Sequence, residues 1–281
     1  MFNSWLPITR AKIFGAKILY KVTTLFVGSG KRIIEREGIK YEVDLAEGIE
    51  LSLFLFGKFQ KHITTNSFLK IEKDYTIIDI GANVGLMTLQ FAKLVPQGKV
   101  FSFEPTHYAL ERLKKNLTLN PGLAKNVTVI NSFVSEKSDA NPGIVAYSSW
   151  RVNGEHEKNL HPVHQGTPKD TQGVPSVSLN DFVEQQQLIK IDFIKVDTDG
   201  HEYEVFKGAE KAIAKYRPKI IFESALYVLD EKNIGFEFYL DYFGKLNYKL
   251  MDTMTDAEIT AKNYRKYVPK KGSTDLIAIP M

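Results

Sequence analysis

The residues best suited to chemistry form a glycine-bearing turn, and a carboxylate follows it at the end of the next apolar run. The turn extends from Asp79 to Gly85 after the apolar strand 77–80, and Glu104 ends the following strand. Gly81 lets a ligand approach the backbone where a side chain would block it. A carboxylate after the second strand can accept both hydroxyls of a ribose. This pattern predicts the binding site of a nucleoside cofactor.

The spacing of the glycines indicates which nucleoside cofactor fits. A dinucleotide site follows G-x-G-x-x-G, because the third glycine brings the helix start close to a pyrophosphate. Here Gly81 and Gly85 enclose three other residues, and Asp79 stands directly at the strand end. A carboxylate in that place repels pyrophosphate but suits a cofactor that carries an ammonium group. The pattern therefore predicts S-adenosylmethionine and disfavours a nicotinamide oxidoreductase.

A second polar cluster occupies residues 192–202. Its apolar part, 193–196, should be the fourth strand of the cofactor-binding half, which places Asp197 at the carboxyl end, where open α/β sheets bind ligands. The amine of Lys195 is expected to neutralise neighbouring acids. Three further polar residues are expected at the same edge: Asp199, His201 and Glu202.

The rest of the chain must provide a sheet that positions these residues. Strands are expected at 41–45, 49–56, 76–80, 99–103, 127–133, 174–177, 191–196, 218–223, 247–251 and 276–279. Helices are expected at 59–71, 84–95, 106–119, from 180, and at 202–215 and 235–245. This alternation predicts an α/β fold with a mostly parallel sheet covered by helices on both faces.

The two ends of the sheet carry separate predictions. The first two strands are expected to form a hairpin around Glu47 and Gly48. The last two are expected to form an antiparallel edge, an ending typical of the seven-stranded, Rossmann-like class I methyltransferase fold. Residues 135–173 lack periodicity and are expected to be a loop or insertion that shapes a substrate site.

The composition is that of a globular protein with a basic amino-terminal segment. Apolar residues make up 43% and charged residues 25% of the chain, and the absence of cysteine excludes disulfides and Cys-based metal sites. This composition fits a cytoplasmic protein. The net charge is +4, but residues 1–34 contain six basic residues and no acidic one.

Apolar spacing predicts an amphipathic helix between Arg10 and Phe26. Lysines 12, 17 and 21 interrupt its apolar run, which excludes a signal sequence or a spanning helix. Two roles remain open for residues 1–34: a cap on the core, or contact with a membrane surface, which would make the protein peripheral.

The motifs together resemble the FkbM-type methyltransferases over residues 40–280. They are DIGANVG (79–85), FSFEP (101–105), VSLNDF (177–182), IKVDTDGHE (194–202), FKGA (206–209) and IIFE (220–223). The resemblance implies a class I domain at 41–281 after an amino-terminal extension at 1–40. It also implies methyl transfer from S-adenosylmethionine to a hydroxyl of a sugar, glycolipid or secondary metabolite. A nucleic-acid partner is not expected, because the fourth strand is followed by Asp197-Thr-Asp-Gly and not by Asn/Asp-Pro-Pro-Tyr/Phe, and because the chain outside residues 1–34 has no net positive charge.

The resemblance also assigns roles to residues. It implies that Asp79, Gly81, Asn83 and Gly85 form the turn at the methionine end of the cofactor, and that Glu104 holds its ribose. Ser135, with Glu136, would flank the adenine, and Asp197 would lie near the sulfonium. At position 199 the family more often has Glu, so the carboxylate of Asp199 is withdrawn by one methylene.

An alcohol acceptor must lose a proton as it attacks, which requires a positioned base. His201 is the first candidate because its unperturbed pKa lies near neutrality. Asp197 and Asp199 are alternatives, either as bases or as groups that orient His201. An acid in the first helical turn, such as Glu202, can instead simply cap the helix.

Other hypotheses must be compared with this one. Asp197 and Glu223 could hold Mg²⁺ or Mn²⁺ for metal-assisted transfer, but no third ligand is evident. His156, His161 and His164 have a spacing that allows a metal site, although exposed loop histidines are the simpler interpretation. A non-catalytic, membrane-associated protein that keeps only cofactor binding is a further alternative.

Overall fold

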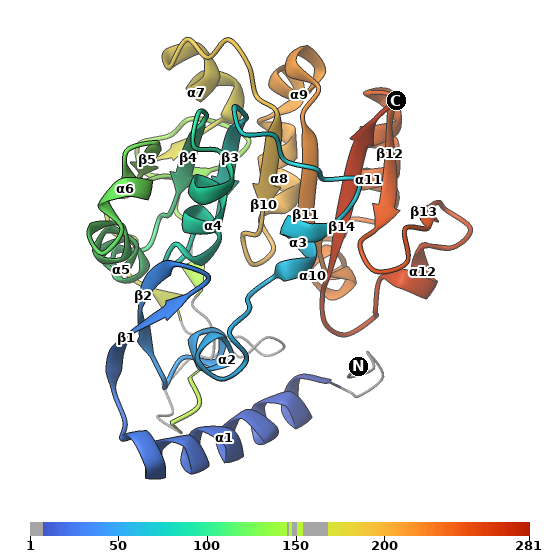
Figure 1. Ribbon diagram of the computed structural model, residues 1–281. Coiled ribbons are helices and arrows are strands. Elements are labelled where there is room, and N and C mark those ends of the chain that lie inside the picture. Colours follow the sequence, from blue (N-terminus) through green and yellow to red (C-terminus); the bar gives the residue numbers. More distant parts are fainter. Residues whose placement is uncertain (1–7, 145, 148–150, 154–167) are drawn as a thin grey trace.

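A central sheet of eight strands organises the molecule (Figure 1). The computed structural model describes residues 8–144, 146–147, 151–153 and 168–281. In spatial order the strands are β13 (Glu258–Ile259), β12 (Tyr248–Asp252), β14 (Thr274–Pro280), β11 (Lys219–Ser224), β10 (Phe193–Val196), β3 (Thr76–Ile80), β4 (Lys99–Phe103) and β5 (Val127–Ile130). The five strands from β11 to β5 are parallel, whereas β14 is antiparallel to both neighbours.

This topology confirms the predicted α/β class, with a mostly parallel sheet and an antiparallel edge. The sheet has eight strands and not the expected seven. The additional strand is β13, which lies beside β12, and a strand of two residues gives no periodic signal in a sequence.

Side chains alternate across the sheet, as the period of a strand requires. Ile77 and Phe193 pack on the face covered by α3 (Lys61–Thr65) and α4 (Leu86–Leu94). Ile78 and Ile194 pack on the opposite face. Its helices are α7 (Leu179–Gln185), α8 (Glu202–Lys207), α9 (Glu210–Tyr216), α10 (Leu226–Glu231) and α11 (Glu237–Lys245), with α12 (Tyr264–Tyr267) at the edge. Because both faces are covered, the interior strands are mainly apolar on both sides.

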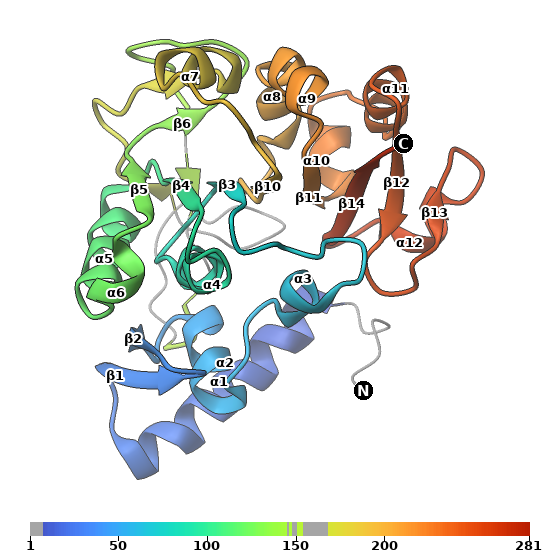
Figure 2. The same ribbon diagram turned by 45° about the horizontal axis from the view of Figure 1, so that its top comes forward.

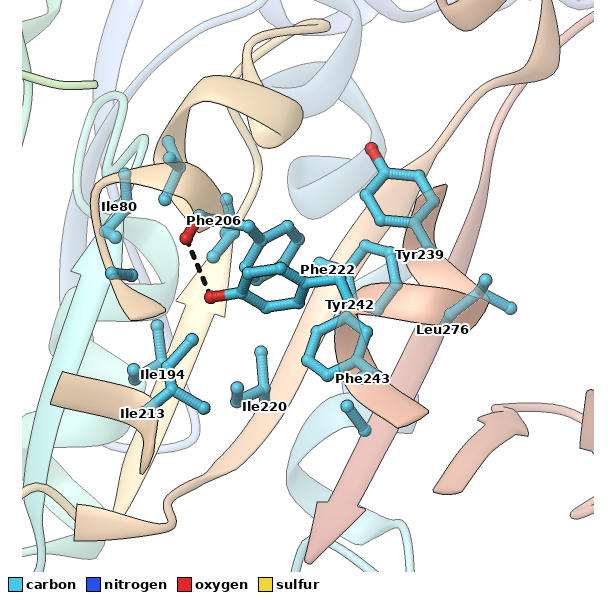
Figure 3. Packing of buried hydrophobic residues seen from close by; sticks show 14 of the residues in the cluster. Ile80, Ile194, Phe206, Ile213, Ile220, Phe222, Tyr239, Tyr242, Phe243 and Leu276 are labelled. Atoms are coloured by element: carbon cyan, nitrogen blue, oxygen red, sulfur yellow. Dashed lines mark hydrogen bonds between the residues drawn. The ribbon is translucent and has the colours of Figure 1, made fainter. Parts of the chain in front are cut away.

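Aromatic side chains fix α8 on this second face (Figure 3). The rings of Phe206 and Phe222 meet edge to face, with 5.1 Å between their centroids. The hydroxyl of Tyr242 donates a hydrogen bond of 2.7 Å to the carbonyl oxygen of Phe206. Since α8 follows β10 after a short turn, this packing also holds the turn that carries Asp197 and His201.

The amino-terminal elements lie together at one side of the sheet, as Figure 2 shows. They are α1 (Ile8–Val27), β1 (Lys31–Arg36), β2 (Ile39–Asp44) and α2 (Gly48–Phe56). The predicted amino-terminal helix is thus present in the structure, and β1 pairs with β2 in a hairpin that crosses residue 40. The hairpin packs near α5 (His107–Thr118), where Asn116 accepts a 2.7 Å hydrogen bond from the amide of Glu42. The helix α6 (Pro121–Ala124) follows α5.

The prediction of a strand at residues 49–56 is wrong. These residues form α2, whose carboxyl end is closed by Gly57 in the left-handed region, with its amide donating to the carbonyl of Leu53. The alternation of apolar and polar residues at the start of this segment is the same as in a half-buried strand. The hairpin turn is accordingly not at Glu47 and Gly48 but at residues 37–38, between β1 and β2.

Smaller differences concern helix lengths. Of the helix expected at 59–71, only α3 is helical, and α10 is a helix without a counterpart in the sequence prediction. The helix expected at 202–215 is divided at Gly208, where a Cβ would lie 2.0 Å from the carbonyl oxygen of Ser135. None of the described helices is long and apolar enough to cross a membrane.

Residues 135–173, expected to be an insertion, contain short paired strands where they are described. Within this segment β7 (Ala146–Tyr147) pairs with β8 (Pro168–Lys169), and just outside its two ends β6 (Phe133–Val134) pairs with β9 (Ser176–Val177). Val152 is buried and its amide donates to the carbonyl of Ala46, which anchors this segment to the chain before α2.

Candidate functional site

The register of the parallel strands brings the predicted site residues to one edge. Ile80 of β3 lies opposite Phe103 of β4 and Val196 of β10, and Val196 lies opposite Phe222 of β11. Each of these four residues is followed directly by a predicted site residue or candidate ligand: Gly81, Glu104, Asp197 and Glu223. Because parallel strands end at the same edge, the four positions converge there.

A cavity of about 320 Å³ lies at this edge, a size typical of small-molecule sites. Most of the predicted site residues line it: Gly81, Asn83, Glu104, Asp197, Asp199 and His201. Its lining also includes Gln60, Glu47 and Glu50, Tyr108 and Arg112 from α5, Ser132 to Val134, and Ile144 and Ala146. The last two belong to the expected insertion, so that segment does contribute to the wall.

Glu104 is buried within this wall and holds the turn that precedes α4. One carboxylate oxygen accepts a 2.8 Å hydrogen bond from the amide of Asn83, which is in the left-handed region. The other accepts hydrogen bonds from the amide and hydroxyl of Thr106, at 2.9 and 2.6 Å. Burial raises the pKa of Glu104 above its usual value, although these hydrogen bonds act to lower it. Since each carboxylate oxygen has two lone pairs, Glu104 retains acceptor capacity toward the cavity.

Asp79 does not line the cavity, although the sequence places it at the methionine end of the cofactor. It is fully buried in the row of β3, β4 and β10 that faces α4, and it accepts a 2.6 Å hydrogen bond from the hydroxyl of Thr88. Lys195 lies opposite Asp79 in the sheet, with its amine 3.7 Å from Asp79 and 3.1 Å from Asp197. Lys195 thus contacts both acids, as expected.

The electrostatic environment of Lys195 keeps it charged. Burial alone would lower its pKa, but Asp197 and Asp79 raise it above the usual value. Burial in turn raises the pKa of Asp79, while Lys195 and Thr88 oppose this shift. The three charged groups therefore form a fixed unit, and only Asp197 and Lys195 reach the cavity.

Packing contacts that the sequence alone does not show explain why the turn has glycine at positions 81 and 85. A Cβ on Gly81 would lie 1.8 Å from the backbone oxygen of Asp197, so the glycine is required by the neighbouring strand end. A Cβ on Gly85 would lie 3.1 Å from the side chain of Leu113 on α5. Both residues have positive φ angles, of 80° and 85°. Close packing of the turn, besides the approach of a ligand, explains them.

Asp199 and His201 both face the cavity from the turn between β10 and α8. Asp199 has a φ of 52°, in the left-handed region that is uncommon for residues other than glycine. Its side chain is exposed to the cavity, but the surrounding protein limits its hydration, and Asp197, Glu202 and Glu104 repel a further negative charge. These effects raise its pKa to about 8. His201 is the N-cap residue of α8 and has an interaction partner.

Glu202 organises this turn and does not line the cavity. One of its carboxylate oxygens accepts hydrogen bonds from the amide of Thr198 at 2.9 Å, from its hydroxyl at 2.8 Å and from the amide of Gly200 at 3.3 Å. Burial raises its pKa. These contacts agree with the simpler expectation for Glu202, in which it caps the turn before α8.

Ser135 lies outside the lining of the cavity. Its amide donates to the carbonyl of Val177, and the adjacent Glu136 forms a 2.7 Å ion pair with Lys207 on the surface. The neighbouring residues that do line the cavity are Ser132, Phe133 and Val134. The sequence predicts a strand that continues to residue 133, whereas β5 ends at Ile130, and this difference shifts the predicted contact along the chain.

Several lining residues carry no functional assignment in the sequence analysis. Gln60 donates a 3.3 Å hydrogen bond to Asp197, and its buried Oε1 has no hydrogen-bond partner among the described residues. No sequence signal marks this position. Glu50 and Arg112 form two hydrogen bonds of 2.5 Å within the wall. In the sequence, Arg112 and Asn116 are spaced four residues apart, which places both on one face of α5. This spacing is the feature that could have indicated a polar, inward-facing side of the helix.

The cavity wall carries more acidic than basic groups. Its carboxylates are Glu47, Glu50, Glu104, Asp197, Asp199 and Glu223, whereas its permanently charged bases are Lys195 and Arg112. Burial and the neighbouring charges of Asp197, Glu202 and Asp199 raise the pKa of Glu223 well above its usual value. The raised pKa values of Asp199 and Glu223 keep these two groups protonated near neutral pH, so the charge that attracts a cation and repels a pyrophosphate comes from the other carboxylates of the wall.

The proposed metal ligands, Asp197 and Glu223, lie near each other at adjacent strand ends, but the fixed ammonium of Lys195 already contacts Asp197. In the described part of the chain, no group of three potential ligands from His, Cys, Asp and Glu converges. His156, His161 and His164 lie outside the described residues.

Comparisons with known proteins identify the family of the chain. A family model described as the methyltransferase FkbM domain matches residues 79–250, more than half of the chain. "Methyltransferase sdnD" of Sordaria araneosa is 28% identical over 200 residues, which cover 60% of this chain and 76% of that protein. "Hexuronic acid methyltransferase AglP" of Haloferax volcanii is 28% identical over 142 residues, which cover 50% of this chain and 53% of that protein.

Two further likenesses extend the comparison. "2-O-methyltransferase NoeI" of Sinorhizobium fredii is 28% identical over 152 residues, which cover 51% of this chain and 61% of that protein. The crystal structure of a methyltransferase FkbM from Methylobacillus flagellatus has a TM-score of 0.45 at 14% identity, covering 96% of this chain and 58% of that one. Two of the three relatives named are thus matched over less than two thirds of their length.

Proposed function

Since the chain belongs to the FkbM methyltransferase family, we propose that it transfers a methyl group from S-adenosylmethionine to a hydroxyl of a small-molecule or glycan acceptor. The observation that carries this proposal is the acid-lined cavity at the carboxyl ends of β3, β4, β10 and β11. The printed names of two relatives, a hexuronic acid methyltransferase and a 2-O-methyltransferase, support a sugar hydroxyl as the acceptor.

The residues present fit this cofactor. Glu104 lies after the second strand of the cofactor half, and the carboxylate oxygen that accepts from Asn83 has one lone pair left for a ribose hydroxyl. Asp197, together with the buried Oε1 of Gln60, which is unpaired among the described residues, offers acceptors to a positively charged methionine end. Ser132, Phe133 and Val134 contribute both apolar and polar side chains to the cavity wall. We propose this wall, in place of Ser135, for the adenine.

When bound, the cofactor would supply a sulfonium methyl group, whose carbon–sulfur bond breaks as the acceptor oxygen bonds to the carbon, leaving a neutral thioether. The ion pair between Lys195 and Asp197 fixes the carboxyl end of β10, which forms the wall of the cavity at this point. We propose that Asp199 or His201 takes the proton that the hydroxyl loses, since both titratable side chains line the cavity.

Cofactor titration by calorimetry tests the donor. Wild-type protein is expected to bind S-adenosylmethionine, and Glu104→Ala to bind it at least about tenfold more weakly, because one good charged hydrogen bond contributes about 1.5–3 kcal/mol. Glu184→Ala, on an exposed position of α7 outside the cavity lining, is the matched control. Saturable binding of NADH without binding of S-adenosylmethionine would contradict the proposal.

Mass spectrometry tests the acceptor. Extracts that contain sugars and glycolipids are incubated with the protein and methyl-labelled cofactor, and the label is expected in a methyl ether. Labelled nitrogen or carbon positions, with no methyl ether, would overturn hydroxyl transfer. Removal of divalent cations by a chelator is expected to leave the rate unchanged, because the ammonium of Lys195 already pairs with Asp197.

A further inference from the structure

The helix α1 exposes a stripe of large apolar side chains. Leu25 and Phe26 are 83% and 84% exposed, and Ile18, Leu19 and Val22 are between 42% and 49% exposed. At 100° per residue these five side chains fall within one arc of the helix surface. Soluble monomeric proteins rarely leave a contiguous apolar stripe of this kind in contact with water.

The same helix already has an inward face. Ala16 and Tyr20 pack against the apolar cluster formed by β1, β2 and α2. Figures 1 and 2 both show α1 beside α2 at the margin of the molecule. The two packed positions lie on the opposite side of the helix from the exposed stripe. The helix therefore caps the core with one face and presents a second apolar face outward.

Positive charges flank the exposed stripe. Lys17 and Lys21 occupy the helix surface between the packed face and the stripe, and Lys31 and Arg32 follow shortly after the helix. Residues 1–34 contain no acidic residue that would offset them. Apolar and aromatic side chains bordered by lysines form the pattern of helices that lie in a membrane interface.

We propose that this face of α1, which consists of the five exposed apolar side chains with Lys17 and Lys21, binds the surface of a bilayer that contains anionic lipid. The apolar stripe enters the boundary between headgroups and acyl chains, while the lysine amines reach the phosphates. A second copy of the chain fits less well, because it would bring two sets of lysines together without any acid from this segment. The inference is independent of methyl transfer.

Vesicle flotation with the full chain tests this surface. Wild-type protein is expected to float with vesicles of phosphatidylcholine mixed with phosphatidylglycerol, to bind pure phosphatidylcholine more weakly, and to lose binding as salt is added. Leu25→Ser combined with Phe26→Ser should lower the partition coefficient by at least about tenfold, since both side chains lose their buried apolar area. Lys17→Ser combined with Lys21→Ser should remove the preference for anionic vesicles.

Ile189→Ser is the matched control, because Ile189 is 92% exposed but lies far along the chain, between α7 and β10. Its vesicle binding should equal that of the wild type, and thermal unfolding should show that all variants are folded. Absence of wild-type binding, or equal binding by the Leu25 and Phe26 variant, would overturn the proposal. So would a dimer in sedimentation experiments that dissociates in this variant while vesicles bind neither protein.

Discussion

At the scale of single residues, Lys195 determines the charge balance of the site. It is buried between Asp79 and Asp197, and its amine compensates two carboxylates that come from adjacent strands. A buried carboxylate that loses its partner is costly, because the low-polarity interior cannot replace water. Lys195 is therefore required for the stability of the strand ends as well as for the electrostatics of the cavity.

Replacement of Lys195 by Met should expose this dependence. The variant Lys195→Met is expected to lose about 3–5 kcal/mol of unfolding free energy, measured by denaturant titration at neutral pH. Lys190→Ala is the matched control, because its pair with Asp74 is at the surface, and its loss should be under about 1 kcal/mol. A similar loss in the two variants would contradict the buried ion pair.

Asp199 should give the reaction a pH dependence. Its pKa of about 8 means that the folded protein keeps the proton through neutral pH, and only the ionised form can accept one from an alcohol. The ratio kcat/KM is therefore expected to rise with pH through about 8, and Asp199→Asn should lack this step. His201→Ala should retain it. If the step instead persists in Asp199→Asn and is lost in His201→Ala, the base is His201.

At the scale of elements, the ends of β3 and β10 are joined through their backbones. Gly81 lies against the backbone oxygen of Asp197, so the glycine turn and the polar turn form one surface. No other residue can occupy position 81 without moving the strand end. The positive φ of Gly81 adds a second restriction, because residues with a Cβ are strained in that region.

The variant Gly81→Ala is expected to lose about 3 kcal/mol or more of unfolding free energy, since backbone strain and overpacking add. Thermal or denaturant unfolding measures this loss. Gly122→Ala in α6 is the matched control, because a Cβ at position 122 would meet no neighbouring atom within 4 Å. The stability of this control should be unchanged or slightly higher. An equally stable Gly81→Ala protein would show that the strand ends are not in close contact.

The helices α2 and α5 are joined by the buried pair of Glu50 and Arg112. Arg112→Met is expected to cost about 3–5 kcal/mol, because it leaves Glu50 buried without its partner. The double variant Arg112→Met with Glu50→Leu should cost less than the sum of the two single variants. A double-mutant cycle in denaturant should give a coupling of about 1–3 kcal/mol. Strict additivity would mean that the two helices are held by other contacts.

At the scale of the whole molecule, carboxylates from distant parts of the chain surround one cavity. Glu47 and Glu50 come from the region of α2, Glu104 follows β4, and Asp199 and Glu223 come from the ends of β10 and β11. A cationic ligand gains from this arrangement, and by linkage its binding should lower the pKa values of the nearby acids.

The protein should therefore bind S-adenosylmethionine more tightly than the uncharged thioether S-adenosylhomocysteine, and the preference should grow with pH. Asp199 ionises as the pH rises through about 8, so the ratio of the two affinities should be larger at about pH 9 than at about pH 6. Calorimetric titrations at both pH values measure the ratio. A ratio independent of pH would mean that Asp199 does not act on the sulfonium.

The sequence identified the strands of the cofactor half well, since β3, β4 and β10 are apolar runs bounded by clear turns. It failed for α2, where residues 49–53 alternate like a strand although the segment forms a helix that packs against α1, β2 and α5. Tertiary burial determined its conformation, because an apolar segment enclosed on several sides needs no amphipathic helical pattern.

By itself, the sequence determined the family, the α/β sheet, and the set of residues at the strand ends, because these depend on local patterns and direct chain order. The tertiary structure alone decided how those residues act. The strand register placed Lys195 opposite Asp79 and brought Gly81 against Asp197, and the packing of distant segments added Gln60, Glu50 and Arg112 to the cavity wall. Contacts between residues far apart in the chain follow from register and packing, which no local pattern encodes.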